Sequence, residues 1–155
     1  MPNIIVRLPD GVLDAGAKQQ LASLLNTCAA DAEQLADDPR SRALCWVVVD
    51  EVRPGNWTCG GVDMTAQAVP VIVQVFVPAG VLDGAARARY ATGIYHAVHQ
   101  ALPAGERMAL VSSIFTEVPD GYWGVNDSVW HLAEFARQAG YRHLPAMTPA
   151  ASVRP

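Results

Sequence analysis

The sequence has few charged residues. Asp, Glu, Lys and Arg together make up 17% of its 155 residues, whereas an average soluble domain has about 25%. Hydrophobic residues make up 51%, and the formal net charge is −4. Because the side chains that cover a solvated surface are scarce, we expect part of the apolar surplus to be buried between subunits, and we predict an oligomer.

The sequence also lacks long apolar runs and basic clusters. No run reaches the roughly 18 uninterrupted apolar residues of a membrane-spanning helix, and the start shows no charged segment followed by an apolar one. There is no run of Lys or Arg and no interleaving of basic and aromatic residues, and Lys18 is the only lysine. We therefore expect no membrane partner and no nucleic-acid partner.

Paired cysteines are missing as well. Cys28, Cys45 and Cys59 are odd in number and have no metal-type spacing. Unpaired cysteines are typical of a reducing compartment, so we predict a cytoplasmic protein. His96 and His99 have a helical spacing that can bind a metal, but no third ligand accompanies them. We interpret both as surface residues and predict no metal site.

Two segments of the sequence occur twice, in the same order. Residues 9–18 (PDGVLDAGAK) match residues 78–87 (PAGVLDGAAR), and residues 51–57 (EVRPGNW) match residues 117–123 (EVPDGYW). Self-similarity of this kind indicates a structural repeat. We predict two copies of one unit within a single domain.

Each copy has the pattern of a strand, a helix and a second strand. A short β-branched run ends at a proline, an aspartate follows in N-cap position (Asp14 or Asp83), and apolar residues then recur at helical spacing. The second strand of each copy is a nearly continuous apolar run, which predicts burial on both faces. The expected strands are 4–8, 44–49, 71–77 and 109–115.

The length of each unit determines how its strands pair. A strand–helix–strand unit of this size implies parallel pairing with a right-handed crossover. The predicted fold class is therefore α+β: tandem βαβ repeats form a four-stranded sheet with two helices on one face, and the other face stays apolar and uncovered within one chain. We predict a single domain at 1–145 with repeats at 2–59 and 70–125, loops at 38–41 and 103–106, a linker at 60–69, a short helix at 127–140 capped by Asp127, and a flexible tail at 146–155.

Pro2 is the residue with unusual chemistry. Initiator methionine is usually removed before a small residue such as proline, and we expect this to leave Pro2 with a free secondary amine. An apolar pocket would bring the pKa of this amine toward neutrality, where a general base is most useful. Pro70 looks like its counterpart in the second copy, but the Pro70 nitrogen lies in a peptide bond, and strict register places it one position too early unless a bulge intervenes. We predict one catalytic proline per chain.

Three features together resemble the tautomerase superfamily. They are Pro2 at the start of a βαβ unit, the Pro/Gly turn after the first strand, and the segment 51–57 with Gly60 and Gly61 behind it. Over roughly residues 2–130, the chain is similar to the fused two-unit form of the 4-oxalocrotonate tautomerase-like proteins. This form is related to cis-3-chloroacrylic acid dehalogenase and malonate semialdehyde decarboxylase. The resemblance implies the tautomerase/MIF-like fold, a homotrimer with six βαβ units, and no metal or organic cofactor.

The resemblance also assigns roles to individual residues. Pro2 matches the proline that moves protons between carbon and the enol oxygen. Trp57 falls at the position of an aromatic residue that walls the pocket and keeps the proline amine uncharged. Trp123 holds the same position in the second copy, and which tryptophan faces Pro2 depends on subunit packing.

The family's substrate-binding arginines are absent from the matching positions, as are the water-activating glutamate and the helical histidine of the dehalogenases. We therefore expect neither a dehalogenase nor a hydratase of the known kind, and we expect a substrate less anionic than a dicarboxylate. An arginine elsewhere in the chain would have to reach the site from another direction; the candidates are Arg7, Arg42, Arg53 and Arg107. The departing positions hold Val12, Ala29, Trp46, Pro78, Val81, Ser112 and Val125.

What remains resembles an apolar pocket around Pro2 with a few hydrogen-bond donors for a carbonyl or enolate oxygen. The residues that we expect to bind substrate are Trp46, Trp57, Trp123 and Cys59, with Asn56 and Asn126 as the donors. Each has a structural alternative: a tryptophan can fill a core or an interface, an asparagine can form a turn, and a lone cysteine can act as a small hydrophobic residue.

Three functions remain open. The leading hypothesis is an isomerase that catalyses keto–enol proton transfer on a small α-keto or enol acid, with Pro2 as general base. The second is a proline-dependent decarboxylase or hydratase, in which Pro2 acts as nucleophile or acid. The third is a small-molecule-binding member of the fold without turnover, for which the loss of the arginines is the expected sign. A near-neutral pKa of the Pro2 amine would favour catalysis over the third hypothesis.

Overall fold

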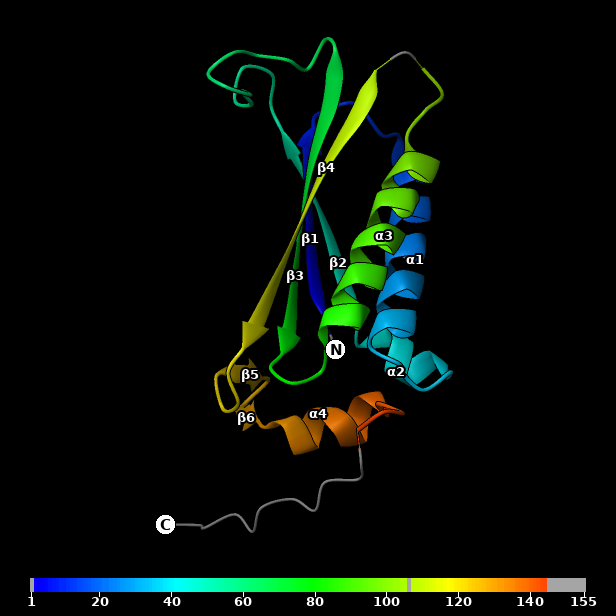
Figure 1. Ribbon diagram of the computed structural model, residues 1–155, viewed down its shortest axis with the longest axis vertical. Helices are drawn as coiled ribbons and strands as arrows, with labels where there is room; N and C mark the ends of the chain where they lie inside the picture. Colours follow the sequence, from blue (N-terminus) through cyan, green and yellow to red (C-terminus); the bar gives the residue numbers. More distant parts are fainter. Residues whose placement is uncertain (1, 106, 145–155) are drawn as a thin grey trace.

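Two layers make up the molecule, a β-sheet and a pair of long helices that cover one of its faces (Figure 1). The computed structural model describes residues 2–105 and 107–144. No helix within these ranges is long and apolar enough to cross a membrane. In chain order the elements are β1 (Asn3–Pro9), α1 (Ala15–Ala32), α2 (Pro39–Ala43), β2 (Trp46–Val52), β3 (Ala68–Pro78), α3 (Gly84–Ala101), β4 (Met108–Val118), β5 (Trp123–Val125), β6 (Ser128–Trp130) and α4 (Leu132–Ala139).

The main sheet has the strand order β2-β1-β3-β4. β1 is parallel to β2 and β3 is parallel to β4, whereas β1 and β3 are antiparallel at the centre, where Ile5 pairs with Gln74. α1 and α3 lie side by side on one face of this sheet (Figure 1). The predicted α+β fold of tandem βαβ repeats with two helices on one face is confirmed.

The two repeats make equivalent contacts. Asp14 caps α1 by accepting a hydrogen bond from the Ala17 N–H (2.7 Å), and Asp83 caps α3 by accepting one from the Ala86 N–H (2.6 Å). The two caps are 69 positions apart (83 − 14), which confirms the predicted helix starts. Two more contacts are repeated. The first is a backbone hydrogen bond of 2.9 Å, from the Asp10 N–H to the Val52 carbonyl and from the Ala79 N–H to the Val118 carbonyl. The second is an ion pair, Lys18–Glu51 (2.6 Å) in one repeat and Arg87–Glu117 (3.4 Å) in the other.

Pro70 is not the structural counterpart of Pro2. β3 pairs with β4 in unbroken register along its whole length, so the bulge that would align the two prolines does not occur. The shift of 69 between the repeats therefore places Val71 at the position of Pro2. Pro70 lies inside β3, buried.

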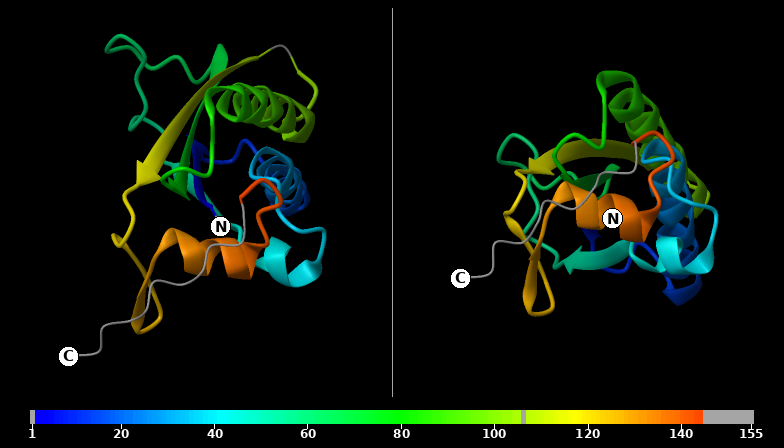
Figure 2. Two further views of the ribbon diagram at one scale, coloured as in Figure 1. Left: turned by 60° about the horizontal axis from the view of Figure 1, so that its bottom comes forward. Right: turned by 90° about the horizontal axis from the view of Figure 1, so that it is seen from below.

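The connecting segments differ from the prediction at three places. The expected loop at 38–41 forms α2, because Asp38 accepts hydrogen bonds from the Arg40 and Ser41 N–H groups and so caps a helical turn. The expected linker at 60–69 is shorter, since β3 begins at Ala68. The helix expected at 127–140 begins only at Leu132, because β5 and β6 precede it as a hairpin and Asp127 lies in the hairpin turn. α4 then crosses one end of the sheet (Figure 2); the tail at 146–155 lies outside the described residues.

The expected burial of β2 and β4 on both faces is wrong. Both are edge strands of the sheet, and exposure alternates along them. Trp46 is 64% exposed and Ile114 is 43% exposed, whereas Ala109 is buried. Since helices cover only one face, the continuous apolar runs arise from apolar residues on both faces of half-covered strands.

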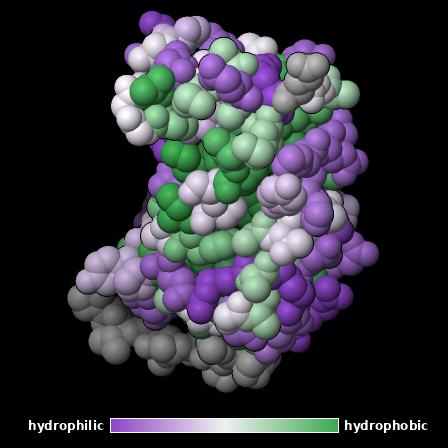
Figure 3. Space-filling view, turned by 45° about the horizontal axis from the view of Figure 1, so that its top comes forward, coloured by the Kyte–Doolittle hydropathy of each residue, from purple (hydrophilic) through white to green (hydrophobic). Residues whose placement is uncertain are grey.

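The helix-free face of the sheet, which we call the open face, is mainly apolar, with Asn3 at the start of β1, Ser112 and Thr116 along β4, and one polar group at its centre. There the Arg7 side chain donates hydrogen bonds to Asp50 (Nε, 3.0 Å) and to Gln74 (Nη1, 2.6 Å). Apolar side chains gather across the middle of the molecule, with polar side chains toward both ends (Figure 3). By the alternation of each strand, the apolar members of the open face include Ile5, Trp46, Val48, Ile72, Phe76, Met108, Leu110 and Ile114.

Candidate active site

Pro2 lies directly before β1 and is buried. Its carbonyl accepts a hydrogen bond from the Trp46 N–H at 3.1 Å, so the starts of β1 and β2 are joined. Because β3 and β4 run opposite to β1, the carboxyl end of β4 lies at this same end of the sheet. We call it the Pro2 end, and we call the opposite end, where β2 finishes and β4 begins, the far end.

Three of the predicted binding residues lie at the Pro2 end. Trp46 starts β2, but its side chain is largely exposed on the open face. Trp123 starts the β5–β6 hairpin that follows β4, and its half-buried ring contacts the Phe135 ring of α4 at a centroid distance of 5.4 Å. Asn126 lies in the turn of this hairpin with a φ of 54°, in the left-handed region that turn asparagines tolerate. Within one chain, Trp123 is therefore the tryptophan of the matched pair that shares an end with Pro2.

The other three predicted binding residues lie at the far end. Trp57, Asn56 and Cys59 follow β2, and β1 between the two ends spans about 20 Å. Cys59 pairs with Val62 across a tight turn, with N–O distances of 2.8 Å and 3.2 Å. The two intervening glycines have positive φ values, as a two-residue hairpin turn requires. The structure does not bring these three residues to Pro2 within one chain.

The Pro2 end is closed by α4 and the residues that follow it, for which we predicted no role in the site. α4 crosses this end beside the start of β1 (Figure 2). The buried Phe135 ring packs against Trp123 and Trp130, with ring centroids 5.4 Å and 5.3 Å away. Residues 139–144 then bond to both repeats: the Ala139 carbonyl accepts from the Ala36 N–H (3.3 Å), the Arg142 N–H donates to the Gln34 carbonyl (2.9 Å), and His143 Nε2 donates to the Val81 carbonyl (2.8 Å).

A buried carboxyl group, Glu33, also belongs to this end. Glu33 is the C-cap of α1 and is completely buried, and its Oε2 accepts a hydrogen bond from the Tyr141 hydroxyl at 3.2 Å. Burial raises the pKa of the Glu33 carboxyl. The signal was available in the sequence, because Glu33 continues the four-residue spacing of the buried α1 residues Leu21, Leu25 and Ala29.

The four arginines considered for substrate binding lie elsewhere or already have partners. Arg7 is bonded on the open face, and the Arg107 guanidinium donates to the Thr65 carbonyl (3.3 Å) at the far end. Arg53 is exposed just after β2. The Arg42 guanidinium pairs with the Asp37 carboxylate at 3.3 Å.

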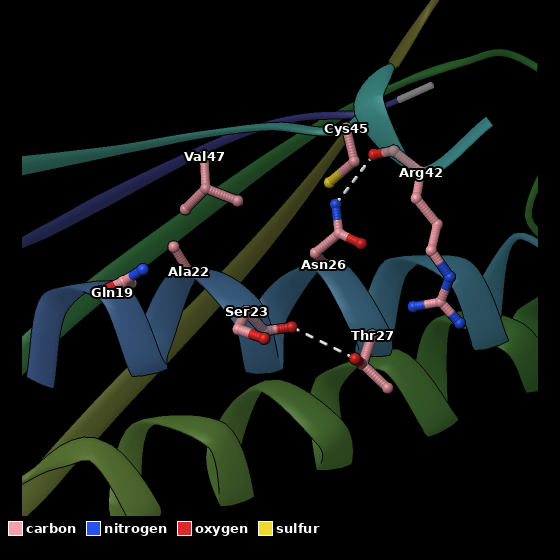
Figure 4. A pocket seen from close by; sticks show the side chains of 8 residues that line it. All are labelled: Gln19, Ala22, Ser23, Asn26, Thr27, Arg42, Cys45 and Val47. Carbon is pink, nitrogen blue, oxygen red and sulfur yellow. Dashed lines mark hydrogen bonds between the residues drawn. The ribbon is translucent and has the colours of Figure 1, made fainter. Parts of the chain in front are cut away.

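A surface pocket of about 540 Å³ lies between α1 and the edge strand β2 (Figure 4). The Asn26 and Cys45 side chains point toward one another in it, and Asn26 Nδ2 donates to the Arg42 carbonyl at 3.0 Å. Of the residues considered for substrate binding, Arg42 alone lines it. His96 and His99 lie apart from both this pocket and Pro2, exposed on α3, where both rings contact Tyr95. Among the described residues, no three His, Cys, Asp or Glu side chains are grouped to hold a metal ion.

Comparison with known proteins identifies the fold. No family model matches the chain, and no curated protein matches it. Among solved structures, a native fused 4-OT is 17% identical with a TM-score of 0.66 and covers 82% of this chain and 94% of its own. A second fused 4-OT, described as a symmetric trimer, is 18% identical with a TM-score of 0.66 and covers 89% and 98%. N1, a member of the cis-3-chloroacrylic acid dehalogenase family, is 16% identical with a TM-score of 0.64 and covers 92% of each chain. The fold that the sequence led us to expect is confirmed.

Proposed function

We propose that this chain, which has the tautomerase-superfamily fold, is an isomerase that catalyses keto–enol proton transfer on a small α-keto or enol acid. Pro2 is the general base, once Met1 has been removed. The observation that carries the proposal is the placement of Pro2 in that fold: it is buried at the start of β1, at the end of the sheet where the second repeat brings Trp123.

In this proposal the neutral Pro2 amine takes a proton from the carbon next to the substrate carbonyl. The electron pair of the broken C–H bond moves to the carbonyl oxygen, and an enolate and a protonated amine result. Return of the proton to a different atom completes the isomerisation. Burial favours this chemistry because it disfavours the charged amine and lowers its pKa.

The side chains at the Pro2 end favour a monoanionic or aromatic substrate. Trp123 and the hairpin that carries it offer an aromatic wall, and Asn126 offers an amide donor. The arginines that would bind a second carboxylate are replaced, and Arg42, which lies in α2 at this end, is paired with Asp37. A second negative charge on the substrate would therefore lack a partner.

We also propose a homotrimer in which the open faces meet. The open face presents apolar side chains on all four of its strands, more than a monomer normally leaves in water. Three of the solved structures with this fold are described as fused 4-OT trimers, one symmetric and two asymmetric. Trp57, Asn56 and Cys59 can take part in a Pro2 site only through a neighbouring chain. A monomer by light scattering at micromolar concentration would contradict the trimer.

The test of the catalytic role is the variant Pro2→Ala, which replaces the secondary amine with a primary one at the same place. With phenylenolpyruvate as substrate, we expect kcat/KM for ketonisation to fall by roughly 100-fold or more. Intact mass must first show that both proteins begin at residue 2, and circular dichroism must show the same fold. Equal rates for the two proteins would remove Pro2 from the mechanism. A covalent adduct trapped on Pro2 by borohydride and a keto acid would instead favour the decarboxylase or hydratase.

A further inference from the structure

Glu33 is a carboxyl group buried in a part of the molecule where the fold itself does not require one. Its counterpart in the second repeat, 69 positions later, is Leu102, which is the C-cap of α3 as Glu33 is the C-cap of α1. A leucine fills this position at the far end, so the local backbone accepts an apolar residue. Burial of a carboxyl group is costly, and its presence only at the Pro2 end points to a task there.

Two independent routes place the Glu33 side chain beside the start of β1. First, Leu102 lines the same small cavity as Val69, two residues before the Pro2 counterpart Val71. The equivalent place in the first repeat is the start of the chain. Second, α1 runs back from the far end, so its C-cap Glu33 lies at the Pro2 end, where the Trp46 N–H donates to the Pro2 carbonyl at 3.1 Å. The effect of the Glu33 charge on the pKa of Cys45, the residue directly before Trp46, agrees with this placement.

Titratable groups from three other parts of the chain interact with Glu33. Tyr141 and His143 come from the segment after α4, Tyr90 comes from α3, and Cys45 precedes β2. Tyr141 donates its hydroxyl proton to Glu33 at 3.2 Å. The Tyr90 hydroxyl is buried and, within the described residues, has no hydrogen-bond partner. His143 is the one basic side chain of the four, and its Nε2 is bonded to the Val81 carbonyl.

We propose that Glu33 is a positioning residue for the Pro2 amine: its carboxylate stabilises the ammonium that forms when Pro2 takes a proton, and Tyr141 holds the carboxylate in place. This inference rests on the proposed function. The proton moves from the substrate carbon to the Pro2 nitrogen, the C–H electron pair moves to the carbonyl oxygen, and Glu33 keeps its charge throughout. The site then has three parts: a base, a carboxylate that stabilises the protonated base, and a group that orients the carboxylate. Other general-base sites have the same arrangement.

The proposal has a consequence for the protonation of Pro2. An apolar pocket alone would lower the pKa of the amine, and a neighbouring carboxylate raises it again. The pair titrates in two coupled steps, of which the higher reports the loss of the proton from the amine with the carboxylate present. Glu33 therefore adjusts the pKa of Pro2 to the working pH.

The experiment is an NMR titration of the Pro2 nitrogen in ¹⁵N-proline-labelled protein, with no substrate. The other ten of the eleven prolines lie in peptide bonds and do not titrate. We expect Glu33→Gln to lower the pKa of Pro2 by roughly one unit or more. Asp31→Asn, which removes the same charge from an exposed position on the same helix, should leave it within about 0.3 units.

An unchanged Pro2 pKa in Glu33→Gln, a rise, or an equal shift in Asp31→Asn would overturn the proposal. Tyr141→Phe removes only the hydroxyl that holds Glu33, and it decides the question if Glu33→Gln does not fold. A smaller shift in the same direction supports the proposal, and no shift contradicts it. Because the titration needs no turnover, it is separate from the Pro2→Ala assay: loss of activity in Pro2→Ala with no effect of Glu33→Gln keeps the proposed function and removes this inference.

Discussion

The Pro2 end and the far end of the sheet are built from the same repeat but are covered differently. At the far end, β2 leads into an exposed loop with glycine turns, and Leu102 caps the helix. At the Pro2 end, β4 leads into a hairpin and α4, and the buried Glu33 caps the helix. The difference indicates that the repeat supplies the frame, while the segment after the second repeat and one substituted cap residue make one end into a candidate site.

The largest effect that this comparison predicts is at Phe135. Phe135 is 2% exposed and packs between two tryptophans of the hairpin, whereas Trp57 at the far end is only half-buried. We expect Phe135→Ala to lower the free energy of unfolding by about 3–5 kcal/mol. Urea unfolding measures it, with Trp57→Ala as the control. If the two variants lose the same stability, the closed Pro2 end contributes no more than the open loop.

A smaller difference is expected between two glycines with nearly the same backbone. Gly140 has a φ of 62° and Gly60 a φ of 60°, so an alanine at either position costs about 1–2 kcal/mol. A Cβ atom at Gly140 would lie 2.8 Å from the Ala36 Cβ, whereas nothing lies within 4 Å at Gly60. We expect Gly140→Ala to cost about 1 kcal/mol more than Gly60→Ala. Equal midpoints in urea would show that residues 139–144 are not packed against the α1–α2 connection as described.

The smallest effect is a pH dependence confined to the Pro2 end. The His131 imidazole pairs with the Asp120 carboxylate at 2.9 Å, and this hydrogen bond raises the pKa of His131 and lowers the pKa of Asp120. A histidine whose pKa rises on folding stabilises the fold at pH values below its pKa in the unfolded chain. This stabilisation is lost as the pH rises through the pKa of the histidine in the folded protein. The ion pair therefore stabilises the fold at pH values between the lowered pKa of Asp120 and the raised pKa of His131.

Thermal unfolding at pH 6 and pH 8 tests this pair. His131→Asn should lower the melting temperature slightly at pH 6 and less at pH 8. Because both side chains are more than half exposed, the loss should shrink further in high salt. A larger loss at pH 8 than at pH 6 would contradict the assignment.

Most of the frame could be predicted from the sequence because its signals are local. The caps Asp14 and Asp83, the prolines that end β1 and β3, and the helical stripe through Tyr90 and Ile94 each depend on neighbours a few residues away. The second half of the β5–β6 hairpin was assigned to the helix expected at 127–140 because Asp127 also fits a helix cap. The burial of β2 and β4 was overestimated because a run of apolar residues does not say which of two faces a helix covers.

The site was harder to predict because its members come from distant parts of the chain. The matching Trp57 and Trp123 look equivalent in sequence, but the antiparallel pairing of β1 and β3 puts them at opposite ends. Glu33 and Tyr141 meet only because residues 139–144 return to the end of α1. The position of Glu33 in a row of buried helical residues could have indicated a buried carboxyl group. No nearby residue in the sequence indicates that Tyr141 is its partner.

The position of α4 across the Pro2 end (Figure 2) has a consequence for synthesis. α4 begins at Leu132, near the end of the described chain, so it leaves the ribosome long after Pro2. At about 5–20 residues per second, the start of the chain is accessible for on the order of ten seconds before this cover exists. If Pro2 acts as we propose, removal of Met1 therefore belongs to the nascent chain, before the last helix covers this end.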